Sequence, residues 1–66
     1  MFLIETMEKC NRFLDKFRVN GWEVWRMQYY WDLPEGLHAW FRKTGETDIE
    51  VVTHNENVHK AILKFK

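Results

Sequence analysis

The chain opens with apolar residues at helical spacing. From position 3 to position 17 they recur at steps of four and three residues, and charged residues fill most of the positions between them. Such steps place apolar side chains on one face of a helix. The stripe consists of Leu3, Met7, Cys10, Leu14 and Phe17, with Phe13 beside it. Asn20 and Gly21 predict the end of this helix, because glycine readily takes the left-handed conformation found just past helix C-termini.

From Trp22 the apolar residues change to every second position, which predicts a strand from Trp22 to Asp32. Leu33-Pro34-Glu35-Gly36 then suits a three-residue hairpin loop, with a type I turn and glycine in the left-handed bulge position. A loop of that length fixes the pairing of the two strands. The pairs would be Leu33 with Leu37, Trp31 with Ala39, Tyr29 with Phe41, Tyr30 with Trp40, and Gln28 with Arg42.

A second turn, a third strand and a closing helix complete the pattern. The turn lies around Thr44-Gly45-Glu46-Thr47, and the strand runs from about Asp48 to Thr53. Thr53-His54-Asn55-Glu56 has the spacing of a capping box, in which Thr53 would cap the helix. The apolar face of this helix would consist of Val58, Ala61, Ile62 and Phe65.

These elements predict a single α+β domain over residues 1–66, with the order α-β-β-β-α. The strands would form a three-stranded antiparallel meander, with the two helices packed on one face. Because side chains alternate along a strand, the odd-numbered strand residues would face the helices. These residues are Trp25, Met27, Tyr29, Trp31, Leu37, Ala39, Phe41, Ile49 and Val51.

The even-numbered residues would form an open face that neither helix covers. That face would carry Trp22, Val24, Arg26, Gln28, Tyr30, His38, Trp40, Arg42, Glu50, Val52 and His54. Trp, Tyr and Arg are the residue types that dominate binding energy at protein interfaces. The candidate binding residues are therefore Trp22, Arg26, Gln28, Tyr30, Trp40, Arg42 and Val52. In the other interpretation, aromatic pairs across the strands only stabilise a small sheet, by about 0.2–1 kcal/mol each. Arg42 would face Glu50 across the sheet and pair with it.

Composition narrows the classes of partner. Aromatic residues make up 17% of the 66 residues, and the single cysteine excludes an intrachain disulfide. Ten Lys and Arg balance ten Asp and Glu, so net charge gives no argument for a nucleic acid or an anionic membrane as partner. No apolar run approaches the roughly 18 residues of a membrane span, and the N-terminus lacks the pattern of a signal peptide. We expect a cytoplasmic protein, since an unpaired cysteine fits a reducing compartment.

The sequence offers little for catalysis or metal binding. It contains no Ser, and Cys10 falls on the apolar stripe of the first helix, where a thiol would be buried and inert. Glu56 and His59 are spaced as two ligands on a helix, whereas a zinc site needs three or four. Each glycine is explained by a helix end or a turn, so no phosphate-binding loop is present. We therefore expect no enzyme activity, no metal site and no cofactor.

The order of a helix, three antiparallel strands and a helix resembles the double-stranded-RNA-binding domain, over the whole chain and in topology only. That family binds RNA through its first helix, the loop between its first two strands, and lysines at the start of its last helix. Here the loop contributes Glu35, and Lys60 is the only fixed positive charge near the start of the last helix. Three strands followed by a helix also resemble the DNA-binding domains of some phage and transposon integrases.

Basic residues gather on the two helices, so phosphate contacts would come from there and not from the acidic sheet region. The candidate nucleic-acid contacts are Lys9, Arg12, Lys16, Lys60 and Lys64. The sequence favours a non-enzymatic protein-interaction module, a small regulator or inhibitor that binds a larger partner through the open face. Self-association into a homodimer through the same face is a close variant, and a nucleic-acid-binding module is the alternative. Short, aromatic-rich proteins are common in phages and mobile elements, and we expect such a source.

Overall fold

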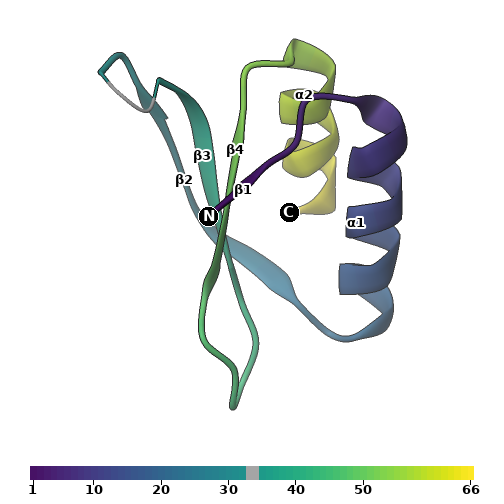
Figure 1. Ribbon diagram of the computed structural model, residues 1–66. Coiled ribbons are helices and arrows are strands. Elements are labelled where there is room, and N and C mark those ends of the chain that lie inside the picture. Colours follow the sequence, from purple (N-terminus) through teal and green to yellow (C-terminus); the bar gives the residue numbers. More distant parts are fainter. Residues whose placement is uncertain (33–34) are drawn as a thin grey trace.

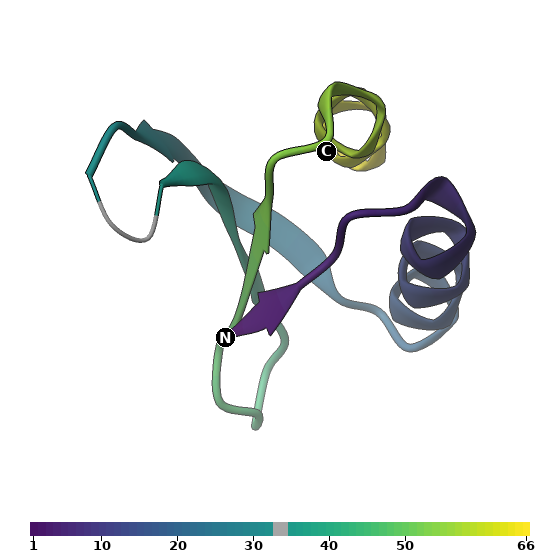
Figure 2. The same cartoon turned by 45° about the horizontal axis from the view of Figure 1, so that its top comes forward.

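The structure, a computed structural model, describes residues 1–32 and 35–66. Its strands are β1 (Phe2–Leu3), β2 (Glu23–Tyr30), β3 (Gly36–Arg42) and β4 (Ile49–Thr53), and its helices are α1 (Met7–Val19) and α2 (Glu56–Phe65). Both helices lie on the same side of the sheet (Figure 1), and the turned view shows the same two layers (Figure 2). The molecule is therefore α+β, as the sequence predicts.

Over the described residues the sheet has four strands in the order β1-β4-β3-β2, so the prediction of a three-stranded sheet is wrong. β2, β3 and β4 form the predicted antiparallel meander, and β1 adds a strand parallel to β4. Leu3 belongs to β1 and not to the first helix, although it lies four residues before Met7. The helix begins at Met7 because the Thr6 side chain caps it, accepting a hydrogen bond from the Lys9 backbone N–H at 3.2 Å.

The C-terminal end of α1 confirms the prediction at Gly21 and corrects the one at Trp22. Gly21 has φ 79°, and its N–H donates to the Arg18 carbonyl at 3.4 Å. The Trp22 N–H donates to the Phe17 carbonyl at 3.0 Å, and the two rings stack with centroids 4.7 Å apart. This is the hydrogen-bond pattern and apolar contact of a Schellman motif. It turns Trp22 towards the core, whereas the sequence placed Trp22 on the open face.

A β-bulge in β2 reverses which residues face the helices in the first half of that strand. Val24 lies opposite Phe41 and Arg26 opposite Trp40, so Trp25 is the extra residue. An extra residue shifts the in–out alternation by one position. Val24 is therefore buried in the core, and Trp25 is 42% exposed on the opposite face. The sequence predicted the reverse for both residues, whereas those after the bulge keep their predicted faces.

The register between β2 and β3 also differs from the predicted one. The observed pairs are Met27 with Ala39, Gln28 with His38, Tyr29 with Leu37 and Tyr30 with Gly36. The predicted pairs are therefore wrong for Trp31–Ala39, Tyr29–Phe41, Tyr30–Trp40 and Gln28–Arg42. Trp31 lies beyond the end of β2 and is 82% exposed, so it is not a core residue, and Tyr29 is itself half exposed. Leu33 and Pro34, with the turn predicted on them, lie outside the described residues.

The closing helix starts two residues later than the capping-box pattern predicts. Its cap is Asn55, whose side-chain oxygen accepts from the Asn57 N–H at 2.8 Å and the Val58 N–H at 3.4 Å. Thr53 is instead the buried last residue of β4, and its hydroxyl accepts from the Asn55 N–H at 3.0 Å. The helix therefore begins at Glu56, and the Thr53 hydroxyl supports the cap without being the cap.

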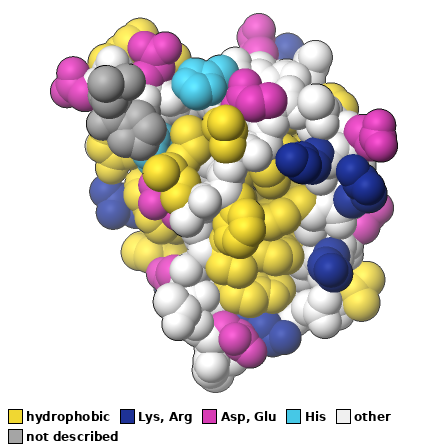
Figure 3. All heavy atoms as spheres, viewed as in Figure 1, with side chains coloured by type: hydrophobic (Ala, Val, Ile, Leu, Met, Phe, Trp, Pro, Cys, Tyr) yellow, Lys and Arg dark blue, Asp and Glu magenta, His cyan; other side chains and the backbone are white. Residues whose placement is uncertain are grey.

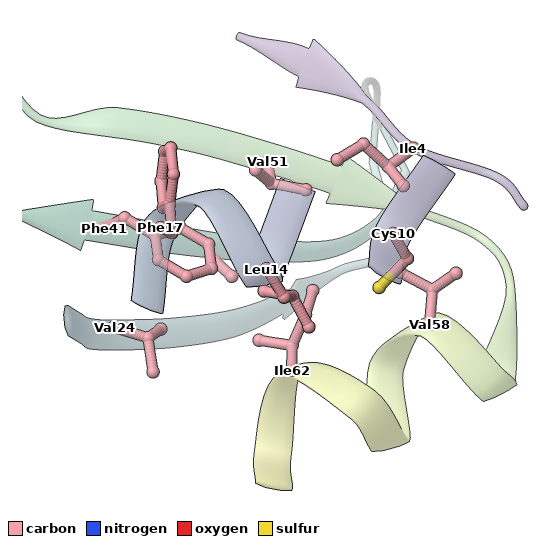
Figure 4. Packing of buried hydrophobic residues seen from close by; sticks show 10 residues of the cluster. Ile4, Cys10, Leu14, Phe17, Val24, Phe41, Val51, Val58 and Ile62 are labelled. Atoms are coloured by element: carbon pink, nitrogen blue, oxygen red, sulfur yellow. The ribbon is translucent and has the colours of Figure 1, made fainter. Parts of the chain in front are cut away.

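The core fills the space between the sheet and the two helices (Figure 4). Its buried members are Ile4, Cys10, Leu14, Phe17, Val24, Ala39, Phe41, Val51, Val58 and Ile62. Phe41 is fully buried, and its ring lies between 5.1 and 5.7 Å from the rings of Phe13, Phe17 and Phe65. The stripes predicted on both helices from Cys10 onwards thus meet over the sheet and leave its other face uncovered.

Candidate functional site

The open face of the sheet is the candidate functional site. Among the described residues no helix covers this face (Figure 2). Its members are Leu3, Glu23, Trp25, Arg26, Gln28, Tyr30, His38, Trp40, Arg42, Glu50 and Val52. Six predicted binding residues are therefore brought together, and Trp22 is not among them. Val24 is also in the core, and His54 lies between β4 and α2, where its backbone N–H donates to Glu5 Oε1 at 2.8 Å.

A histidine held between aromatic rings forms the centre of the open face. The His38 ring centroid lies 4.4 Å from that of Tyr30 and 5.9 Å from that of Trp40, and the residue is only 4% exposed. His38 Nδ1 lies 2.5 Å from Glu50 Oε2. A buried polar ring costs free energy unless it is hydrogen-bonded, so the Glu50 contact allows His38 to occupy this position. Glu50 was predicted to pair with Arg42, and the structure assigns it to the histidine.

Two arginines lie over the tryptophans of the open face. The guanidinium carbon of Arg26 is 4.5 Å from the Trp40 ring centroid, and that of Arg42 is 5.7 Å from the Trp25 ring centroid. Arg42 Nε also donates to Glu23 Oε1 at 2.7 Å. An exposed cation–π contact contributes about 0.5–1 kcal/mol, so these contacts add modestly to stability. Their main consequence is that the aromatic and cationic groups are held in defined positions relative to one another.

Trp25 is the aromatic member of the open face that the sequence predicted to lie in the core. Its indole N–H donates to Asp48 Oδ2 at 3.1 Å, which ties β2 to the residue just before β4. The bulge that exposes Trp25 contains no glycine and has no mark of its own in the sequence. An indirect signal exists at Gly21, because a glycine just past a helix end directs the next residue, Trp22, back onto the last turn of the helix. Trp22 could have been assigned to the core on that ground.

The apolar surface of the sheet is exposed at its edges more than at the centre of the open face. Val52 is buried there, and Tyr30 and Trp40 are half-buried. Among the described residues, six of the eight exposed large apolar side chains belong to the two edges: Met1, Phe2 and Leu3 at β1, and Trp25, Tyr29 and Trp31 on or just after β2. A binding surface that uses the open face therefore extends to the β2 edge.

The candidate nucleic-acid residues fall into two groups. One group lines a shallow hollow on α1 and comprises Lys9, Arg12 and Lys16, with Phe13 between them. Figure 3 shows Lys and Arg side chains along α1, beside an apolar area between that helix and β1. The second group, Lys60 and Lys64, is exposed on α2. The structure thus brings the three cations of α1 together, and the two lysines of α2 are not among the residues that line this hollow.

Two groups with catalytic potential, His38 and Cys10, are buried. His38 is covered by its aromatic neighbours, and Cys10 is 1% exposed. Burial raises the pKa of the Cys10 thiol, which keeps it protonated and weakly nucleophilic. Within residues 1–32 and 35–66, no three His, Cys, Asp or Glu side chains are grouped so that they could hold a metal ion. The same residues include no helix with the length and apolar character needed to cross a membrane. The absence of enzyme activity stays a prediction.

Comparisons with protein-family models, with curated proteins and with solved structures found nothing that matches this chain. From α1 to α2 the elements follow the order of the double-stranded-RNA-binding domain, but β1 adds a fourth strand parallel to β4. The open face is therefore the feature of the molecule that bears on its function.

Proposed function

We propose that this protein is a non-enzymatic interaction module, a small regulator or inhibitor that binds a larger protein partner through the open face. The observation that carries the proposal is the aromatic and arginine cluster on a sheet face that neither helix covers, with Arg26 over Trp40 and Arg42 over Trp25. Trp, Tyr and Arg are the residues most often responsible for binding energy in protein interfaces. The single buried Cys10 suits action in a reducing compartment such as the cytoplasm.

The cluster is ordered before any partner arrives. Arg26 Nη2 donates to Gln28 Oε1 at 2.8 Å while it lies over Trp40. Tyr30 contacts Trp40 edge-on, with ring centroids 6.4 Å apart, and both pack against the buried His38. Ordering an interfacial side chain on binding costs about 0.5–1.5 kcal/mol, and most of that cost has already been met here by intramolecular contacts. Such preorganisation favours tight binding by a small surface.

A substitution on the open face tests the proposal. Trp40→Ala removes the ring that Arg26 and Tyr30 contact, and Leu63→Ala removes an exposed apolar side chain on α2 as a matched control. Proteins captured by the immobilised wild type and by Leu63→Ala should be lost with Trp40→Ala, while circular dichroism shows that both variants remain folded. Equal capture by all three would contradict a role for this face.

A second copy of the chain is the variant of this proposal. Two open faces packed back to back would cover the half-buried Tyr30 and Trp40 of both copies. The open face carries Arg26 and Arg42 together with Glu23 and Glu50, so opposite charges are available to both copies. The molar mass in light scattering separates this variant from an outside partner, because Trp40→Ala should convert such a dimer to a monomer.

A nucleic-acid-binding function is the alternative, and the hollow on α1 favours it. Lys9, Arg12 and Lys16 meet there, and among the described ion pairs neither lysine has a carboxylate partner. Titration with single- and double-stranded DNA and RNA at two salt concentrations tests it, because phosphate contacts weaken steeply as salt rises. Lys9→Glu combined with Lys16→Glu should then abolish the binding, and no binding by the wild type at low salt would exclude this function.

A further inference from the structure

Within the part of the chain that the structure describes, the outer edge of β2 is the longer unpaired edge of the sheet. In the strand order β1-β4-β3-β2, the two edge strands are β1, with two residues, and β2, with eight. Edge strands invite pairing with another chain unless a bulge, a proline or a lysine blocks it. The bulge at Trp25 protects the first half of β2, whereas residues 26–30 follow a regular ladder and include no Lys or Pro. The one charge in this segment, Arg26, lies over the Trp40 ring of the open face. Tyr29 and Trp31 expose apolar surface at the same place.

The symmetry of a second copy restricts how two such edges can pair. Two antiparallel β2 strands are related by a two-fold axis normal to the sheet, which keeps both open faces on the same side and pairs residues of like face. An axis through Gln28 uses all five residues from Arg26 to Tyr30 and stops at the bulge on each side. An axis through Met27 would draw in the bulge residue Trp25, and one through Tyr29 would draw in residue 31, beyond the strand end.

The side chains that face each other in this register are complementary. Arg26 would lie opposite Tyr30 of the second copy, a cation opposite an aromatic ring, on the open face. Met27 would lie opposite Tyr29 of the second copy on the helix face, a thioether beside a ring. Gln28 would lie opposite Gln28 of the second copy, where the two side-chain amides can each donate and accept a hydrogen bond. No pair of like charges is brought together, so two β2 edges can pair in this register without electrostatic repulsion.

We infer that two copies of this chain associate by antiparallel pairing of residues 26–30 of β2. The two four-stranded sheets then form one eight-stranded sheet, with the helices of both copies on one side and a continuous open face on the other. The contact is made by the strand edge, so this inference goes beyond the proposed function: the two open faces stay uncovered and meet side by side at the paired β2 strands. It differs from the back-to-back dimer, which would cover both open faces.

A charge exchange at Gln28 tests the inference. Gln28 is exposed, and in this register it meets itself at the two-fold axis. Gln28→Glu and Gln28→Lys each place two like charges face to face, which should weaken dimerisation about two- to fivefold in sedimentation equilibrium. Mixing the two variants, one of them isotope-labelled, should restore a dimer, and native mass spectrometry should find the mixed species above the statistical half.

Three outcomes would overturn the inference. A wild type that stays monomeric up to about millimolar concentration shows that the edge does not pair. A mixture of the two Gln28 variants with no excess of the mixed dimer shows that Gln28 is not at the axis. A dimer that survives both Gln28 variants but is lost in Trp40→Ala is the back-to-back dimer, and it supports the variant of the proposed function instead. Because Trp40→Ala leaves the β2 edge intact, failure of one proposal does not imply failure of the other.

Discussion

Deletion of Trp25 tests how β2 divides its side chains between the core and the open face. On β3 the partners of Val24 and Arg26 are the consecutive residues Phe41 and Trp40, so Trp25 is the one residue of β2 without a place in the ladder. Its removal joins Val24 directly to Arg26. Strict alternation then holds along the whole strand, with each remaining side chain on the face it already occupies. We expect the variant to keep the fold.

The cost of this deletion can be worked from the contacts of Trp25. Its hydrogen bond to Asp48 contributes about 0.5–1.5 kcal/mol, and its cation–π contact with Arg42 about 0.5–1 kcal/mol. Burial of the part of the Trp25 side chain that is shielded from solvent adds about 1 kcal/mol. The expected loss is about 2–3.5 kcal/mol, compared with the roughly 3–10 kcal/mol by which a domain of this length is stable. Trp25→Ala, which keeps the bulge, should cost about the same.

Deletion of Ala39 from the neighbouring strand is the matched control, because β3 is paired on both sides and its ladder includes no extra residue. It forces either His38 or Trp40 into the fully buried position of Ala39 and moves Leu37 or Phe41 out of its buried position. The loss of a buried Leu or Phe side chain costs about 2–5 kcal/mol. Urea unfolding followed by circular dichroism should give a cooperative transition with an unchanged m-value for the Trp25 deletion and little or no folded state for the Ala39 deletion. Equal damage by both deletions would refute the bulge argument.

Three further predictions concern the glycines, the thiol and the second helix cap. Gly36 has φ 124°, and a Cβ there would lie 2.8 Å from the Thr53 carbonyl oxygen, so Gly36→Ala should cost about 1–3 kcal/mol more in urea unfolding than Gly45→Ala, whose Cβ meets open space. Burial raises the pKa of the Cys10 thiol, so as the pH rises the unfolded chain loses its thiol proton at a lower pH than the folded chain does. The free energy of unfolding should therefore be unaffected by this group below about pH 8.5 and should fall as the pH rises towards the folded-state pKa. Cys10→Ala should remove this pH dependence. Asn55→Ala removes the acceptor for two N–H groups of α2 and should lower the free energy of unfolding by about 1–2 kcal/mol, and a change below 0.3 kcal/mol would contradict the cap assignment.

The parts of the fold that follow from local periodicity could be predicted from the sequence. The helical stripe through Cys10, Leu14 and Phe17 and the alternation from β3 into β4 are properties of neighbouring residues, and the structure keeps both. The faces of Arg26, Tyr30 and the later strand residues were right because the error in register was four residues, an even number. A pairing that is wrong by an even number of residues thus still assigns each side chain to the correct face.

The parts that depend on long-range contacts could not be predicted. β1 is two residues long, and its partner β4 lies about 50 residues further along the sequence. Nothing near Leu3 in the sequence indicates this pairing, so its spacing to Met7 predicts one more position of the helical stripe. Thr6 offered a cap signal, but the residue three positions on is Lys9 and not the Glu or Gln of a capping box. The pairing of Glu50 with His38, like the bulge at Trp25, likewise follows from the register.

The bulge changes which tryptophan a functional experiment should alter. On periodicity alone Trp22 was a binding candidate and Trp25 a core residue, and the structure exchanges them. Trp22→Ala should therefore remove a ring stacked on Phe17 and act through stability, with partner binding lost only as far as the protein unfolds. Trp25→Ala should weaken binding without denaturant, at a temperature at which the variant is fully folded, because the Trp25 ring that it removes lies with Arg42 on the open face. If Trp25→Ala bound a partner as the wild type does while folded Trp22→Ala did not, the assignment of these two rings would be wrong.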